Sequence, residues 1–218
     1  MLKREGWKVG KNLVYRVYRE EGLVLRTKRP RRNKMAVHRE ERRRPSRPNE
    51  AWSLDFVHDQ LADGAKFRLL TVIDVFSREA LAIEIGSRLR GEDVVGVLNR
   101  LVQRHRAPAT LFVDNGAEFT GHMVDLWAYH RKVKLDFSRP GKPTDNAYIE
   151  TLNGSLRDEC LNLHWFENLA EARHIIEAWR IEYNESRPHM GLGDLTPREY
   201  ALQARSCYKL TGFNPAEN

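Results

Sequence analysis

The order of the expected elements predicts an α/β domain with a mixed five-stranded sheet and helices on both of its faces. Three strand-like runs come first in this chain of 218 residues, and helices and strands then alternate, which gives the order β-β-β-α-β-α-β-α. Three successive strands followed by alternation are typical of a mixed sheet. Hydrophobic residues make up 41% of the chain, which is enough for a buried core in one or two domains.

The first two strands are predicted to form a hairpin. Residues 52–58 and 66–75 are apolar, strand-like runs, and Ala62-Asp63-Gly64-Ala65 between them has the composition of a turn. Ser77-Arg78 marks the next turn, and a third strand is expected over residues 80–86. Because the chain first takes on this apolar character at Ala51, we expect the main domain to begin there.

Helices and short strands follow the three initial strands. An amphipathic helix is predicted over residues 91–105, with an inward face made of Val94, Val95, Leu98, Leu101 and Val102. The elements expected after it are a strand at 110–113, a helix at 119–131, a strand at 133–137, and helices at 145–160 and 169–185. In the helix at 145–160, the helical period gathers Ile149, Leu152, Leu156 and Cys160 on a buried face. The same period places Glu150 and Arg157 side by side at its edge, so Glu150 can face a cleft.

A basic arm precedes this domain. Residues 1–50 contain 17 Lys+Arg and 6 Asp+Glu, a net charge of +11, and the remaining 168 residues contain 20 and 24, a net charge of −4. Residues 26–50 hold 11 of the basic residues and three prolines but few apolar residues, which predicts a linker that contacts DNA phosphates regardless of sequence. A basic arm joined to a mildly acidic body fits an enzyme that acts on nucleic acid, although such an arm can also be only a solvated tail.

The N-terminal segment contains one predicted helix. Residues 11–21 have apolar side chains at helical spacing, and Gly22 ends the pattern. This helix is interpreted either as the end of a small helical DNA-binding module or as a helix that docks on the main domain. The boundaries expected for the whole chain are 1–25 for the end of a helix-turn-helix-like module, 26–50 for the basic linker, 51–205 for the catalytic core and 206–218 for a tail.

Several classes of protein are excluded by composition. No segment is long and apolar enough to cross a membrane, and the N-terminus lacks the apolar stretch of a secretory signal. The two cysteines, Cys160 and Cys207, have neither the spacing of metal ligands nor the density of a disulfide framework. These features favour a protein of the reducing cytoplasm.

Three carboxylates stand in settings that call for an explanation. Asp55 occupies the centre of the first strand, Asp114 ends the apolar run Leu111-Phe112-Val113, and Glu150 follows 35 residues later on a helix. Each one alone has an ordinary interpretation, as a capping, turn or surface residue. If the first and fourth strands are neighbours, however, the fold brings all three together. Three clustered acids repel one another and need cations, which suggests a divalent-metal site for phosphoryl chemistry.

These residues and the sequence segments around them resemble those of a known family. The segments Leu54-Asp55-Phe56 and Val113-Asp114-Asn115-Gly116-Ala117-Glu118-Phe119, followed by Glu150, resemble the DDE catalytic core of retroviral-type integrases. The resemblance is closer to the second-frame transposases of a bacterial insertion-sequence family with that core. The supporting segments lie at 71–78, 138–146, 183–189 and 195–200, so the resemblance covers nearly the whole chain.

The resemblance implies a fold, an activity and a set of partners. It implies a ribonuclease-H-like fold in which Asp55, Asp114 and Glu150 hold two Mg²⁺ or Mn²⁺ ions per active site. It further implies a transposase that cuts and joins double-stranded DNA at the ends of an insertion sequence. Such a protein would be bacterial, cytoplasmic and nucleoid-associated, and it would act as a homo-multimer on DNA. An upstream-frame product is a further expected partner, because the family's fuller helix-turn-helix is represented here only by residues 6–26.

Other polar residues near the acids and in the arm are candidates for DNA contact. They are Lys142, Asn146, Asn153 and Arg157 around Glu150, and Arg31, Arg32, Arg43 and Arg44 in the arm. Alternatively, these are ordinary solvated surface residues, some of which form ion pairs along a helix. For Asp74 we expect a structural role, with Arg78 as its partner, and for Glu118 a supporting role behind the acids. Two other functions stay open: a nuclease that only hydrolyses DNA, and an inactive or truncated copy that only binds it.

Overall fold

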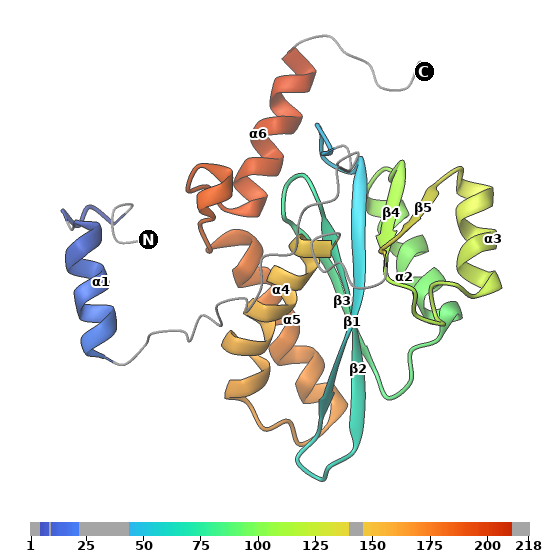
Figure 1. Cartoon of the computed structure of the whole chain (residues 1–218), viewed down its shortest axis with the longest axis horizontal. Coiled ribbons are helices and arrows are strands. Elements are labelled where there is room, and N and C mark those ends of the chain that lie inside the picture. The colour runs from blue at the N-terminus through green and yellow to red at the C-terminus, as the bar shows by residue number, and fades with distance from the viewer. Residues whose placement is uncertain (1–4, 9, 22–43, 140–145, 211–218) are drawn as a thin grey trace. The chain divides into compact units, whose positions relative to one another are not determined.

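The computed structural model describes residues 5–8, 10–21, 44–139 and 146–210, with the side chains of 207–210 left out (Figure 1). The chain divides into two compact units, Met1–Arg42 and Arg43–Asn218. The first unit contains the helix α1, Lys11–Glu20, at the position predicted from the sequence. None of the residues of α1 is buried, and apolar side chains of this helix, such as Tyr15 and Val17, are exposed.

The second unit is built on a five-stranded mixed sheet with the strand order β3-β2-β1-β4-β5. The strands are β1 Ala51–Gln60, β2 Lys66–Asp74, β3 Ala80–Gly86, β4 Thr110–Val113 and β5 Lys134–Phe137. The pairs β1–β2 and β2–β3 are antiparallel, and the pairs β1–β4 and β4–β5 are parallel. The predicted hairpin, mixed sheet and pairing of the first and fourth strands are therefore confirmed.

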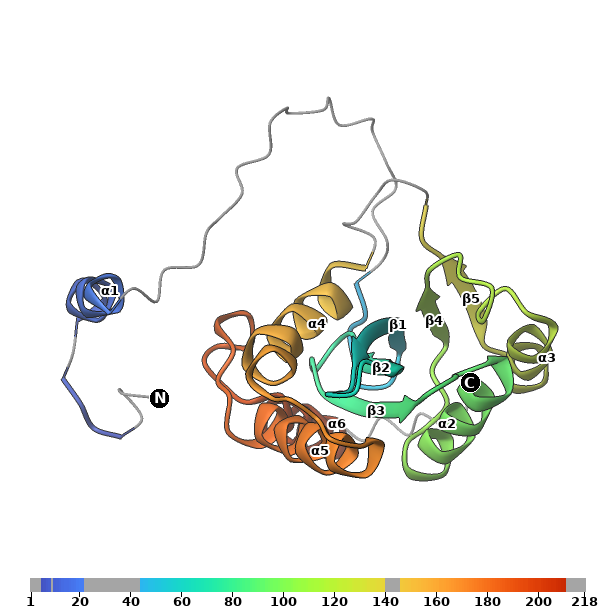
Figure 2. The same cartoon turned by 90° about the horizontal axis from the view of Figure 1, so that it is seen from below.

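Helices cover both faces of the sheet, as Figure 2 shows. One side carries α2, Gly91–Arg104, and α3, His122–Arg131, and the other carries α4, Ala147–Glu159, and α5, Leu169–Glu185. Each layer has its own apolar core. The interior strand β2 contributes to both cores, because Leu70 and Val72 belong to the first and Leu69 and Ile73 to the second. Alternating side chains that are apolar on both faces keep a central strand buried from both sides.

The helix α5 covers the outer edge of β3 with polar side chains. The amide of Asn184 accepts a hydrogen bond from the backbone N–H of Ala80 at 2.8 Å and donates to its carbonyl at 3.0 Å. Arg180 also donates to the Ala80 carbonyl, and Arg173 donates to the carbonyl of Ile85. The exposed hydrogen-bonding groups of an edge strand invite pairing with other chains, and here side chains satisfy part of that edge.

A helix that the sequence analysis did not predict, α6, Pro197–Leu210, packs on α5. It extends past residue 205, where the core was expected to end. Its start is a capping box with proline at the first position: Thr196 Oγ1 accepts from the N–H of Glu199, and a Glu199 carboxylate oxygen accepts from the N–H of Thr196. Two short 3₁₀ helices, Leu161–Leu163 and Met190–Leu192, complete the unit.

Two helix starts differ from their predicted positions. The helix expected from residue 119 begins at His122, because Phe119 and Thr120 donate their N–H groups to the Gly116 carbonyl and form a turn. The helix expected from residue 145 begins at Ala147, and residues 140–145 lie outside the described part of the chain. No helix in the described residues is long and apolar enough to cross a membrane.

Candidate active site

The register of the sheet places Asp55 and Asp114 at the same end of two neighbouring strands. Ser53 of β1 pairs with Phe112 of β4, and this is the last pair of that parallel ladder. Asp55 and Asp114 each lie two residues beyond it. The strand β4 ends at Val113, whereas β1 continues to Gln60 along β2. The carboxyl ends of neighbouring parallel strands are a common location for a site in α/β folds.

The carboxylate of Asp55 is partly buried and held by two hydrogen bonds. One oxygen accepts from the N–H of Phe56 and the other from the side-chain amide of Asn153, both at 2.8 Å. Burial raises the pKa of Asp55 to about 6, and the negative charges of Asp114 and Glu150 add to this increase, while the two hydrogen bonds oppose it. The charges of Asp114 and Glu150 are therefore both within range of Asp55, so a cation near Asp55 would be favoured.

Glu150 is exposed on α4, and Asn153 follows three residues later. The opposite face of that helix packs into the core through Ile149, Leu152 and Leu156, as the helical period predicts. Positions three apart on a helix are neighbours on its surface. The packing of α4 therefore aims Asn153 at Asp55 and leaves the Glu150 carboxylate in solvent beside it.

Gly116, in the loop after β4, lies close to two carboxylates. Its backbone N–H donates to Oδ1 of Asp114 at 2.8 Å. A Cβ atom built on Gly116 would lie 2.9 Å from Oδ1 of Asp114 and 3.3 Å from Oε2 of Glu118. The neighbouring Asn115 donates to the carbonyl of Ser138, which ties this loop to the end of β5. A side chain at this position would therefore displace the Asp114 carboxylate from its present place.

Glu118 is paired with Arg68 of β2. The two side chains form an ion pair and hydrogen bond, and this contact lowers the pKa of Glu118. The guanidinium of Arg68 lies 4.2 Å from the centre of the Phe56 ring, and that ring packs on Phe119 with 5.1 Å between centres. These contacts attach the loop that carries Asp114 to β2 and to β1, the strand that carries Asp55. Sequence reasoning missed Arg68, because nothing in the local pattern links it to Glu118, 50 residues away.

The site is built from segments that match a known family. Two family models, both described as Integrase core domain, match this chain, one over residues 45–143 and the other over residues 131–197. Together the two matches include Asp55, Asp114 and Glu150. An uncharacterized protein of the insertion element IS407 from Burkholderia multivorans is 45% identical over 206 residues. This match covers 94% of the chain and 74% of that protein. The chain belongs to the bacterial insertion-sequence transposases with an integrase core.

Other relatives and solved structures agree with this membership. An uncharacterized protein of the insertion element IS476 from Xanthomonas euvesicatoria is 38% identical to the transposase, whose chain spans 62% of that relative's length. In fold, the transposase is similar to a chain in the simian T-cell lymphotropic virus intasome, with a TM-score of 0.63, 17% identity, and coverage of 78% of this chain and 60% of that one. The HTLV-2 integrase catalytic core domain, solved with magnesium, gives a TM-score of 0.56 at 15% identity and covers 72% and 98%. These likenesses confirm the ribonuclease-H-like fold.

The acids of the transposase offer the ligands that hard divalent cations prefer. Mg²⁺ and Mn²⁺ bind carboxylate oxygens, and Mg²⁺ keeps several waters, so a few carboxylates and a substrate phosphate are sufficient. Within the described residues, no three acidic, His or Cys side chains lie close enough to hold a metal by themselves. Asp55 nevertheless shows the crowding of negative charge that a cation relieves. The Oδ1 atom of Asn153 beside it is buried without a hydrogen-bond partner. The donor set therefore fits a divalent ion.

The residues expected to contact DNA have different positions in the structure. Asn153 donates to Asp55, and Asn146 accepts a hydrogen bond from Ser53 at 3.2 Å, so both support the site from α4. Arg157 is exposed and donates to the carbonyl of His58, at the far end of β1. Arg44 is exposed, whereas Lys142, Arg31, Arg32 and Arg43 lie outside the described residues.

Asp74 has the expected structural role but different partners. It is buried, and its two oxygens accept the backbone N–H groups of Asn49 and Phe76. The expected pairing with the Arg78 side chain is wrong, because that guanidinium lies over the ring of Tyr148. Burial raises the pKa of Asp74 to about 6. Two backbone donors in a loop and a turn satisfy this carboxylate, so a side-chain cation is not needed.

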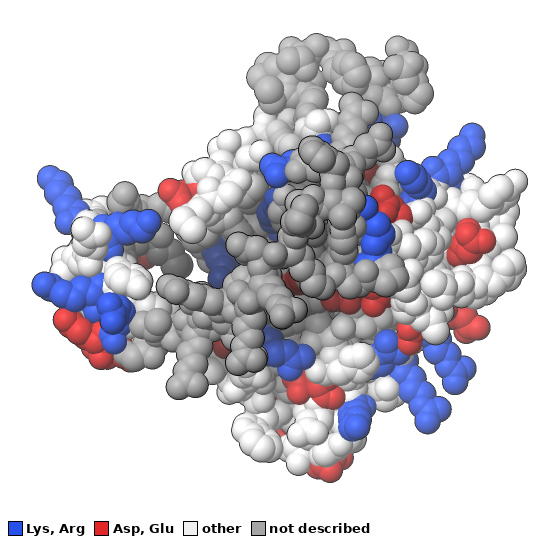
Figure 3. Space-filling model, viewed as in Figure 1, with Lys and Arg blue, Asp and Glu red and all other residues white. Residues whose placement is uncertain are grey.

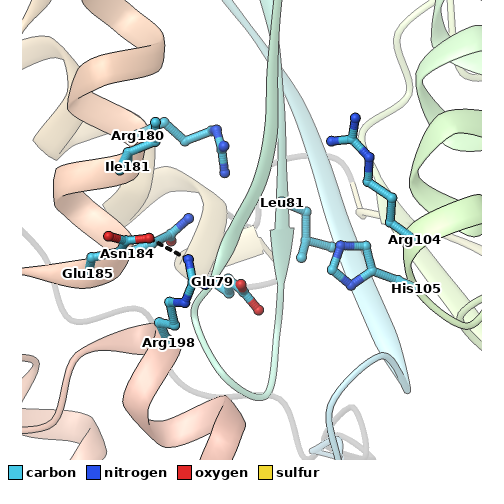
Figure 4. Close-up of a pocket in the computed structure, with 9 residues that line it drawn as sticks. All are labelled: Glu79, Leu81, Arg104, His105, Arg180, Ile181, Asn184, Glu185 and Arg198. Carbon is cyan, nitrogen blue, oxygen red and sulfur yellow. Dashed lines mark hydrogen bonds and ion pairs between the residues drawn. The ribbon is translucent and has the colours of Figure 1, made fainter.

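A separate polar pocket of about 180 Å³ lies between the start of β3, the end of α2 and the helices α5 and α6 (Figure 4). Arginines and acids line it together, and Arg198 pairs with Glu185 while Arg180 pairs with Glu177. Burial raises the pKa of Glu79 in this pocket, although nearby arginines lower it. The charges therefore largely compensate one another within the protein. None of the three candidate catalytic acids lines the pocket, so we assign it no part in catalysis.

Proposed function

We propose that this transposase cuts DNA at the ends of an insertion sequence and joins the exposed ends to a second DNA site. The observation that supports the proposal is the position of Asp55, just past the end of the parallel strand pair, where its carboxylate is within range of the charges of Asp114 and Glu150. A cluster of acids on a rigid sheet and a packed helix is suited to phosphoryl transfer, in which catalysis consists mainly of positioning and charge stabilisation.

The chemistry has two steps that use the same site. In the first, water attacks a phosphodiester, the P–O3′ bond breaks, and the strand ends as a free 3′-hydroxyl and a 5′-phosphate. In the second, this 3′-hydroxyl attacks another phosphodiester, a new 3′–5′ bond forms, and the 3′-oxygen of the second strand leaves. No covalent bond between protein and DNA is needed, so no serine or tyrosine nucleophile is proposed.

We assign Asp55, Asp114 and Glu150 as catalytic residues and as ligands of two Mg²⁺ or Mn²⁺ ions. When bound, such ions activate the attacking oxygen and stabilise negative charge on the leaving one. The magnesium bound to the HTLV-2 catalytic core supports this choice of ion. Asn153 holds the Asp55 carboxylate in place, and the Arg68–Glu118 pair holds the loop of Asp114.

DNA contacts are proposed on α4 and in the basic arm. On and before α4, Arg157, Asn146, Asn153 and Lys142 would bind phosphates near the cut. In the arm, Arg31, Arg32, Arg43 and Arg44 would bind phosphates without reading sequence. On the face of the molecule in Figure 3, acidic and basic side chains are interspersed, so local groups decide where DNA binds. We also propose that the protein acts as a homo-multimer on DNA, together with an upstream-frame product, at the bacterial nucleoid in the cytoplasm.

Replacement of each acid by its amide tests the assignment. Asp55→Asn, Asp114→Asn and Glu150→Gln should each abolish cutting and joining of a duplex copied from the ends of the element, with Mg²⁺ or Mn²⁺ present. DNA binding, measured by fluorescence anisotropy, should remain. Glu159→Gln, on the same helix but paired with Arg187, is the matched control and should stay active. Joining by the Glu150→Gln variant would remove Glu150 from the catalytic set.

A substrate with a pre-formed 3′-hydroxyl end separates the transposase from a nuclease that only hydrolyses DNA. A transposase should join this end to a second duplex, and the product should be longer than either substrate on a denaturing gel. A protein that shortens DNA but never produces the longer strand would be a nuclease. An inactive copy would bind DNA and yield neither product.

A further inference from the structure

A groove with three arginines borders the loop that carries Asp114. It has a volume of about 380 Å³, and its walls come from β2, from the segment between β3 and α2, and from the loop after β4. The lining residues that matter here are Arg68, Arg88, Arg90, Gly91, Ala117 and Glu118. Three arginines and one glutamate are among its lining residues, so the lining has a net positive charge. None of these arginines belongs to the DNA contacts proposed above.

Two of the three arginines are available to a ligand. Arg68 is occupied by Glu118 and the Phe56 ring, so it forms a fixed part of the wall. Arg88 and Arg90 are exposed, and in the part of the chain that the structure describes neither forms an ion pair with an acidic side chain. The backbone N–H of Arg90 donates to Asp93, which fixes the start of α2. The two side chains thus extend from a well-held backbone.

The groove is directly connected to the catalytic loop. Glu118 lies in the groove wall, and its carboxylate and that of Asp114 both approach the Cβ position of Gly116. On β1, the ring of Phe56 contacts Arg68, which lines the groove. The neighbouring residue Asp55 instead contacts Asn153 on α4. Successive residues of a strand point to opposite faces of the sheet. The groove therefore lies on one face of β1, and Asp55 with its α4 contact lies on the other.

The chemistry of the groove fits a phosphate group. Guanidinium groups bind phosphate through paired, charge-assisted hydrogen bonds. The first turn of α2, a helix of 14 residues, adds its positive dipole end at Gly91, which Glu92 and Asp93 in the same turn partly offset. A DNA strand bound at the acids carries a phosphate on each side of the bond that is cut. One side is assigned to α4, and nothing assigned so far holds the other.

We propose that Arg88 and Arg90 bind a backbone phosphate of the DNA strand being cut, in the groove whose wall Arg68 and Glu118 form. This inference rests on the proposed function, because it requires DNA at the three acids. It makes the groove the second anchor of that strand, on the face of β1 opposite α4. Such an anchor would fix the direction in which the strand crosses the site, which phosphate contacts do without reading sequence.

Charge reversal at the groove tests the proposal in the full-length protein. Arg88→Glu and Arg90→Glu should slow the cutting of a duplex copied from the element's ends more than tenfold, about the effect expected of a misplaced strand. The slope of binding affinity against salt concentration should fall by about 1 for each lost phosphate contact. Arg106→Glu is the matched control, because Arg106 is exposed just beyond the other end of α2. It carries the same charge change about 20 Å away.

Crosslinking locates the contact independently of catalysis. Ser87 lines the groove, and a Ser87→Cys variant labelled with a photoactivatable azidophenyl group should crosslink to a radiolabelled duplex of the same sequence. A Gln103→Cys variant, labelled at the opposite end of α2, should crosslink weakly. Arg88→Gln and Arg90→Gln in the Ser87→Cys background should reduce the crosslink. Unchanged thermal unfolding of each variant would show that the fold is intact.

The outcomes separate this proposal from the proposed function. If the unsubstituted protein cuts and joins DNA, but the groove variants behave like Arg106→Glu and Ser87 crosslinks no better than Gln103, the groove proposal is wrong and the function stands. If the unsubstituted protein neither cuts nor joins, the proposed function fails. In that case the groove proposal fails with it, because no strand would be cut there.

Discussion

At the scale of single residues, the environment of Asp55 suits a cation-binding site but lowers the stability of the fold. Burial and two neighbouring acids raise its pKa from 3.8 to about 6. Between these values the folded protein keeps a proton that the unfolded chain has released. Stability therefore falls as the pH rises through this window and stays lower above it, by at most about 3 kcal/mol.

Asp55→Asn should consequently stabilise the protein while abolishing its activity. In metal-free buffer, the variant should be more stable than the unsubstituted protein at about pH 7.5, with nearly equal stability below about pH 4. Asp74 has the same raised pKa, but it contributes equally to both proteins and cancels in the difference. Urea unfolding followed across the pH range measures the effect. A stability difference that does not depend on pH would contradict this account of Asp55.

Gly116 is a second residue where the site limits the choice of side chain. In Gly116→Ala, the new methyl group would meet Oδ1 of Asp114 at 2.9 Å, and this carboxylate would have to move. We expect cutting to slow by up to about 100-fold, because a small displacement of a catalytic group is costly. Stability and DNA binding should change little, since a flexible side-chain end absorbs the shift.

Gly154→Ala is the matched control for that substitution. A Cβ at Gly154, within α4, meets nothing within 4 Å. Alanine at an open position inside a helix should stabilise it by about 0.5–1 kcal/mol, without loss of activity. Thermal unfolding and the cutting assay on both alanine variants provide the comparison. Equal activity of the two variants would show that Gly116 does not position Asp114.

At the scale of secondary-structure elements, the sequence predicted the sheet well because its information is local. Apolar runs separated by turns identified five strands, and the order of elements placed β1 beside β4, which brings Asp55 and Asp114 together. Contacts between distant segments could not be predicted in this way. The hydrogen bond from Asn153 to Asp55, which lies 98 residues away in the sequence, is one such contact. By contrast, Thr196-Pro197 with Glu199 is a local capping signal that could have predicted α6.

The contact between α5 and the edge of β3 leads to a prediction at this scale. Asn184→Ala would leave the buried N–H of Ala80 without its acceptor, whereas the Ala80 carbonyl would keep its bond from Arg180. One unsatisfied buried donor costs about 1–3 kcal/mol. Urea unfolding should show a loss of this size, and the cutting activity at low temperature should persist because the acids are untouched. A variant as stable as the parent would mean that water replaces Asn184 at this edge.

At the scale of the whole molecule, charge is divided between the two parts of the chain. The first 50 residues carry a net charge of +11 and the other 168 a net charge of −4. DNA is a dense array of negative charge, so the acidic body alone would be repelled except at local basic groups. The general attraction to DNA should therefore come from the arm, and the choice of reactive phosphodiester from the core.

Neutralising the arm should therefore weaken DNA binding without affecting the fold of the core. With Arg31, Arg32, Arg43 and Arg44 all changed to Gln, the slope of log affinity against log salt should fall by up to about 0.9 for each lost phosphate contact. The control changes Arg106 and Arg131, two exposed arginines of the core, to Gln and should leave the slope nearly unchanged. Anisotropy titrations at several salt concentrations measure the slope, and thermal unfolding should be the same for all three proteins. An unchanged slope in the arm variant would place the main phosphate contacts elsewhere in the chain, because each contact that is lost must release its counterions.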